Sequence, residues 1–81
     1  MTITATSEVV QLIGECGAEE AEVLLRSLLA HPAADLDWRQ CDKAHAAVVQ
    51  VMMVSRRHVI GPAANSFLEE RVAPALSRLS D

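Results

Sequence analysis

A change of hydrophobic period near Gly17 constrains the fold of this 81-residue chain more than any other feature. Before it, residues 8–15 are rich in aliphatic and β-branched side chains and meet Gly14 near their end, which is typical of a strand closed by a turn. After it, residues 17–30 carry apolar side chains three and four positions apart, which indicates an amphipathic helix that Pro32 stops. The nearly continuous apolar middle of the first segment predicts a central strand.

The middle of the chain repeats this alternation of strand and helix. Residues 34–38 and 57–60 are two short extended candidates, each followed by polar or turn-forming positions. Between them, Asp42 can cap a helix that runs to about Ser55. The buried stripe expected for that helix is Ala44, Ala47, Val48, Val51 and Met52.

The C-terminal segment predicts a third helix. Residues 66–69 have the pattern of a capping box with Ser66 as the cap, and Pro74 predicts a kink or an early end. Its apolar side consists of Leu68, Val72, Ala75, Leu76 and Leu79. The order strand, helix, strand, helix, strand, helix predicts one α/β domain over residues 1–81, with a mixed or mostly parallel sheet of short strands covered by about three helices.

Composition and charge exclude several function classes. The chain is too short for a two-domain enzyme. Seven basic and eleven acidic side chains give a net charge of −4, which repels a phosphate backbone, so we expect no nucleic-acid partner. The longest apolar runs fall short of the ~20 residues of a membrane span, and residues 1–7 lack the features of a secretory signal. We therefore expect a cytoplasmic protein that is not in the membrane.

The side chains that could carry chemistry form no catalytic or metal-binding motif. Cys16 and Cys41 are far apart and form no CxxC pair, so they are expected to be reduced structural thiols. Cys41 and His45 are spaced like helical ligands, but no second ligand pair exists. The carboxylates of Asp35, Asp37 and Asp42 are expected to be solvated at strand ends or helix caps. We expect no enzymatic activity, no cofactor and no metal.

Two segments of the chain resemble one protein family. Residues 12–15, LIGE, are similar to the "L-x-G-E" strand end that precedes the first helix of the STAS domain, the sulfate transporter and anti-sigma factor antagonist family. The run from Leu36, Asp37 and Trp38 to Met53 resembles the strand, short loop and helix of that family without a gap. The resemblance covers residues 10–76 and implies a shortened STAS-like fold.

The resemblance implies a docking site at the start of the middle helix. Family members typically begin this helix with Asp-Ser-Ser/Ala-Gly-Leu, whereas this chain reads HAAVV from residue 45. His45 therefore stands at the place of the aspartate. Ala46 stands at the place of the serine or threonine that a partner kinase phosphorylates in many members, and is a degenerate phosphosite. This register starts the helix a few residues after a cap at Asp42.

The function that the resemblance implies is a non-enzymatic regulatory module of bacterial signalling, including chemotaxis. Asp42, Lys43, His45 and Ala46 are expected to bind a protein partner, an anti-sigma factor or a histidine kinase, without a Ser/Thr phosphorylation switch. Two alternatives stay open. A structural homo-oligomer, such as a homodimer, would hide an exposed sheet edge against a copy of itself. A small thiol-dependent redox protein would need an exposed Cys41 with a depressed pKa.

Overall fold

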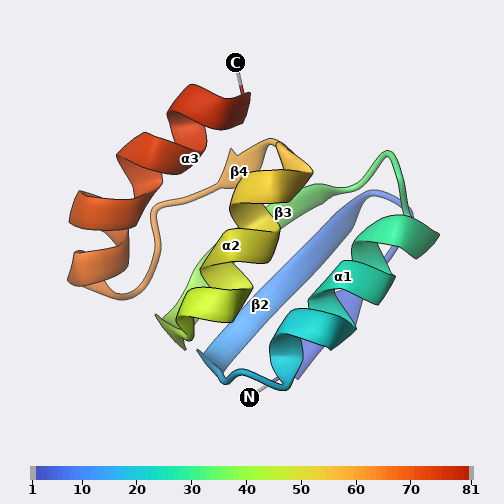
Figure 1. Ribbon diagram of the computed structural model, residues 1–81, viewed down its shortest axis with the longest axis horizontal. Helices are drawn as coiled ribbons and strands as arrows, with labels where there is room; N and C mark the ends of the chain where they lie inside the picture. Colours follow the sequence, from blue (N-terminus) through green and yellow to red (C-terminus); the bar gives the residue numbers. More distant parts are fainter. Residues whose placement is uncertain (1, 81) are drawn as a thin grey trace.

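The computed structural model describes residues 2–80. The elements in chain order are β1 (Thr2–Ala5), β2 (Val9–Cys16), α1 (Glu20–Ala30), β3 (Asp35–Ala44), α2 (Ala46–Ser55), β4 (Val59–Ile60), the π-helical turn η1 (Leu68–Val72) and α3 (Ala73–Ser80). The four strands form one sheet in the order β1-β2-β3-β4. The β1–β2 pair is antiparallel, and the other two pairs are parallel. The predicted α/β fold with a mixed, mostly parallel sheet and three helices is confirmed (Figure 1).

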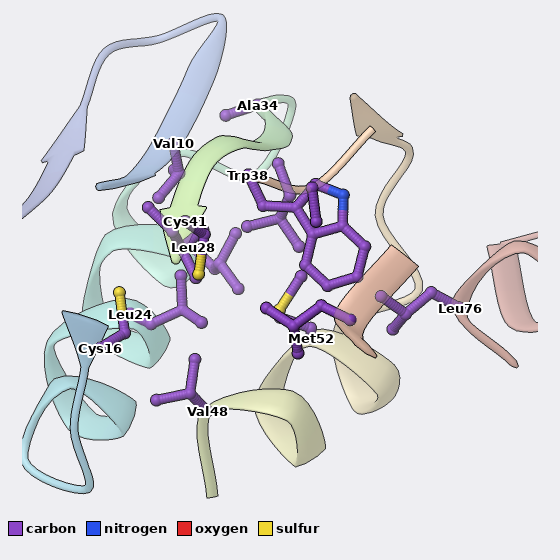
Figure 2. Close-up of a cluster of buried hydrophobic side chains, with 14 residues drawn as sticks. Val10, Cys16, Leu24, Leu28, Ala34, Trp38, Cys41, Val48, Met52 and Leu76 are labelled. Atoms are coloured by element: carbon purple, nitrogen blue, oxygen red, sulfur yellow. The ribbon is translucent and has the colours of Figure 1, made fainter. Parts of the chain in front are cut away.

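One core lies between the sheet and the helices (Figure 2). Strands β2 and β3 contribute alternate residues to it, and α1, α2 and α3 contribute their apolar stripes. The core is mainly aliphatic and includes one aromatic side chain, Trp38, which is 1% exposed. The largest fully buried side chains are Trp38, Leu12, Leu24, Leu36, Met52, Val10 and Val48.

The N-terminal strand was not predicted from the sequence. β1 forms a hairpin with β2, in which Ala5 lies opposite Val10. Thr6 closes the turn, because its backbone N–H donates to the carbonyl of Val9 at 2.9 Å and its hydroxyl accepts from the N–H of Val9 at 3.1 Å. The strand TITA has one large apolar residue, Ile3, so alternation alone is too weak a signal for it. Pairing with β2 supplies the hydrogen bonds that local propensity does not predict.

β3 is longer than the extended segment predicted at residues 34–38. It continues through exposed polar residues to Ala44 because it pairs with β2 along this length. Two register shifts add one residue each to β3, so that both Trp38 and Cys41 are buried in the core. The predicted helix cap at Asp42 is therefore wrong, since Asp42 lies within β3 and α2 begins at Ala46.

The third helix begins and continues differently from the prediction. Asn65, not Ser66, caps it, because the Asn65 Oδ1 accepts the backbone N–H groups of Phe67 at 2.7 Å and Leu68 at 3.3 Å. Pro74 does not end the helix. The turn before it is π-helical, with the N–H of Ala73 donating to the carbonyl of Leu68, and α3 then continues to its end at Ser80.

The predicted apolar stripes agree with the burial of the helices in part. Val48 and Met52 on α2 are buried, as expected, but Ala44 belongs to β3. On the third helix Leu68 and Leu76 are buried, and the side chain of Leu79 lies outside the described residues.

Candidate functional site

The predicted docking residues lie at one edge of the sheet, where the parallel strands β2 and β3 end. Cys16, the last residue of β2, is paired with Ala44, the last residue of β3, and α1 and α2 begin at the same edge (Figure 1). In open α/β sheets, binding sites form outside the carboxyl ends of the strands. A hollow of about 400 Å³ lies at this edge. It is lined by Glu15, Cys16, Gly17, Glu19, Lys43, Ala44 and His45.

His45 turns the chain from β3 into α2. Its backbone is extended, with φ −61° and ψ 150°, and its N–H donates to the carbonyl of Cys16 at 2.9 Å. Its Nδ1 accepts the backbone N–H of Ala47 at 3.1 Å. The histidine therefore does what a capping aspartate or serine does, and satisfies one of the unpaired N–H groups at the helix start.

Ala46 is the first residue of α2, and its side chain is exposed. This is the helix start that the family register predicts. The side chain has no hydroxyl, so it cannot accept a phosphoryl group. The first turn of α2 contains no acidic residue, so no carboxylate of this turn complements the positive end of the helix dipole.

Asp42 and Lys43 are exposed near the end of β3. Asp42 is the extra residue at the second register shift, between Gly14 and Glu15 of β2. The Lys43 Nζ lies 3.9 Å from the Glu15 Oε1, and both side chains are about 70% exposed. Such a pair in solvent contributes little to stability. The structure thus brings the four predicted residues together on one exposed segment.

Two carboxylates at this edge were not predicted from the sequence. Glu15 at the end of β2 and Glu19 before α1 line the same hollow as Lys43 and His45. They are far from residues 42–46 in the sequence, and the parallel pairing of β2 with β3 brings them close. The signal that could have found them is the position of Glu15 at the end of a predicted central strand and of Glu19 shortly after it.

Asp37 braces β3 and is buried, contrary to the expectation of a solvated carboxylate. It is 5% exposed, and it accepts hydrogen bonds from the backbone N–H of Arg39 at 3.0 Å and from the guanidinium at 3.1 and 2.8 Å. The side-chain amide of Gln11 also donates to it, at 3.5 Å. The hydrogen bonds from the Arg39 side chain are the main cause that lowers the pKa of Asp37 to about 2.

The two thiols lie buried in the core near this edge. Cys41 is 0% exposed, and its Sγ donates to the carbonyl of Lys43 at 3.4 Å. Burial is the main cause that raises the pKa of Cys41 to about 12, and burial also raises the pKa of Cys16. A redox role would require an exposed Cys41 with a depressed pKa, and the structure has the opposite.

Residues 2–80 hold no group of three or more His, Cys, Asp or Glu side chains that could bind a metal ion. In the same part of the chain, no helix has the length and apolar character needed to cross a membrane.

Comparisons of the chain with protein-family models, with curated proteins and with solved structures found no match.

Proposed function

We propose that this chain is a shortened STAS-like domain that docks onto an anti-sigma factor or a histidine kinase in bacterial signalling. The docking surface consists of Asp42, Lys43, His45 and Ala46. The observation that carries the proposal is the position of Ala46, the exposed first residue of a helix that starts directly after a parallel strand. The family that the motifs resemble has its modifiable hydroxyl at this place. An alanine there makes docking independent of Ser/Thr phosphorylation.

The charges of the docking surface support a specific, oriented contact. Lys43 and the positive end of the α2 dipole, which no carboxylate of the first turn complements, attract acidic groups. Asp42, together with Glu15 and Glu19 at the same edge, attracts basic groups. A partner must therefore match both signs, which selects its orientation more than it adds to affinity.

The docking surface stands on rigid elements. His45 closes the start of α2 with its side chain, and β3 is hydrogen-bonded to strands on both of its edges. The Asp37–Arg39 pair braces the same strand. A surface that is ordered before binding loses little conformational entropy on association. We expect an interface of about 600–800 Å² per partner.

The test is capture of partners from a lysate of the source bacterium, followed by their identification. The wild-type chain should recover an anti-sigma factor or a histidine kinase. Recovery should fall at least about tenfold with the Lys43→Glu, His45→Glu double variant, because it reverses a charge at the centre of the interface. Arg56→Glu is the matched control, since Arg56 is exposed just after the opposite end of α2.

Two results would contradict the proposed docking surface. Equal recovery of the same partner by the wild type and the double variant would place the interface elsewhere. Stoichiometric phosphate on residues 42–46 of the native protein would contradict the absence of a switch. In contrast, Ala46→Ser should restore a hydroxyl at the helix start, and a captured serine kinase should phosphorylate this variant and leave the wild-type segment unmodified.

A further inference from the structure

An apolar groove lies on the layer of helices. α1 and α2 run side by side in the same direction (Figure 1). A groove of about 610 Å³ lies between them. Leu29 is 73% exposed at its rim and Val54 is 81% exposed. Contiguous apolar surface of this kind marks interaction sites in proteins. The groove is lined by Ala21, Leu25, Leu28 and Leu29 of α1, by Ala47, Gln50, Val51, Val54 and Ser55 of α2, and by Arg57.

We propose that this groove is an interface between two copies of this chain, related by a twofold axis that lies in the interface perpendicular to the helices. Each helix presents a small residue near its start and a large one near its end. On α1 these are Ala21 and Leu29, and on α2 they are Ala47 and Val54. The axis sets each helix antiparallel to its counterpart in the second copy.

This arrangement makes the groove complementary to itself. Leu29 of one copy lies over Ala21 of the second, and Val54 lies over Ala47. Leu25 is midway between Ala21 and Leu29, so it meets its own counterpart at the axis. Large residues on one face then fill the space above small residues on the other, which is what close packing of helices requires.

The charges also favour a second copy as the occupant. The chain has a net charge of −4, so two copies repel each other less at a face that carries no negative charge. The described residues that line the groove include no carboxylate. Their one cation, Arg57, donates to the backbone carbonyls of Leu28, His31 and Ala34 at 2.7–3.0 Å. A charged partner would find no opposite charge available here.

The size of the face predicts a weak dimer. Helices of 11 and 10 residues are about 16 Å long, and at a typical spacing they form a face of roughly 16 by 20 Å. This is smaller than the ~800 Å² per partner of a standard stable interface. We therefore expect a concentration-dependent equilibrium with a Kd on the order of 10–100 μM.

The first experiment is analytical ultracentrifugation of the full chain from micromolar to millimolar concentration. The wild type should pass from monomer to dimer, and Leu29→Glu and Val54→Glu should each raise the Kd at least about tenfold. Phe67→Glu is the matched control, because Phe67 is 64% exposed and does not line the groove. A chain that stays monomeric overturns the proposal, and so does a dimer that resists both groove variants or responds equally to the control.

The second experiment tests the orientation by disulfide trapping under a copper-phenanthroline oxidant, which removes two electrons and two protons from each pair of thiols. The Ala47→Cys, Val54→Cys double variant should form a covalent dimer. Its two cysteines lie about 10 Å apart along one helix, too far to pair within a chain. Val54→Cys alone should cross-link at least about tenfold less, because the axis separates the two copies of this position. Equal or stronger cross-linking of the single variant overturns the antiparallel arrangement.

Discussion

Two junctions between a strand and a helix stand side by side at one edge of the sheet, and they are built differently. The β2–α1 junction uses residues 17–19, and Glu19 at the helix start makes no side-chain cap. The first turn of α1 has its own carboxylates, Glu20 and Glu22. The β3–α2 junction is the single residue His45, which caps the helix with its side chain, and the first turn of α2 is uncharged.

The difference shows which helix start is available to a partner. Carboxylates near the start of α1 complement its dipole within the chain. At the start of α2 no such group follows the cap, so the positive end of the dipole faces solvent beside Lys43. The position that the family resemblance selects is thus also the helix start with no carboxylate in its own first turn.

Both helices are anchored in one core, and removing a side chain that anchors α1 should have the largest effect. Leu24 of α1 is fully buried, so Leu24→Ala should lower the free energy of unfolding by about 3 kcal/mol. Its neighbour Leu25 is 46% exposed, and Leu25→Ala should cost less than about 1 kcal/mol. Urea denaturation of the two variants measures both. Equal losses would show that α1 is not anchored as described.

A smaller effect should come from Asp37, which braces the strand that leads into α2. Its pKa is about 2 in the folded protein and near 3.8 when unfolded, so the folded state is favoured above pH 4 and loses this contribution as the pH falls toward 2. Asp37→Asn should therefore lower stability by about 1–2 kcal/mol at pH 7, less than the full pKa shift implies because Arg39 is half in solvent.

The measurement for Asp37 is the free energy of unfolding between pH 2 and pH 7. The wild type should lose stability relative to Asp37→Asn as the solution is acidified, and the two curves should approach each other near pH 2. Asp35→Asn, on the same strand, is the matched control for the loss of a carboxylate from β3. A constant offset between wild type and Asp37→Asn at every pH would mean that the ion pair is not the cause.

The next largest change in stability is expected from substitutions at the N-cap positions of the two helices, His45 and Glu19. His45→Ala removes the acceptor for the N–H of Ala47 and should cost about 1 kcal/mol. Glu19→Ala should change the free energy of unfolding by less than about 0.5 kcal/mol, because Glu19 makes no side-chain cap bond. Thermal and urea unfolding check both variants. A loss with Glu19→Ala as large as that with His45→Ala would remove the contrast between the junctions.

The smallest effect is expected for the chemical labelling of the two thiols near the junctions. Burial raises the pKa of Cys41 to about 12 and also raises that of Cys16, so neither is a thiolate at neutral pH. An aromatic disulfide reagent at pH 7–8 should leave the folded protein unlabelled and react with both thiols in urea. Rapid labelling of Cys41 in the folded protein would favour the redox alternative instead.

The helices were the part of the fold that the sequence predicted best, because their signal is local. Apolar residues three and four positions apart indicated α1, and its buried residues Leu24 and Leu28 lie on that stripe. The same period placed Val48 and Met52 in the core. The docking segment at residues 42–46 followed from motif resemblance, and its helix start agrees with the structure.

Strand pairing determined the parts of the fold that the sequence did not predict, because its hydrogen bonds join residues that are distant in the sequence. β1 has a weak local pattern, and the second half of β3 is polar, yet both are strands because β2 supplies their partners. The same pairing places Asp42 at a register shift, buries Asp37, and brings Glu15 and Glu19 to the edge that holds His45. The sequence by itself determined which segments could be amphipathic helices, and tertiary contacts determined which polar side chains share a surface.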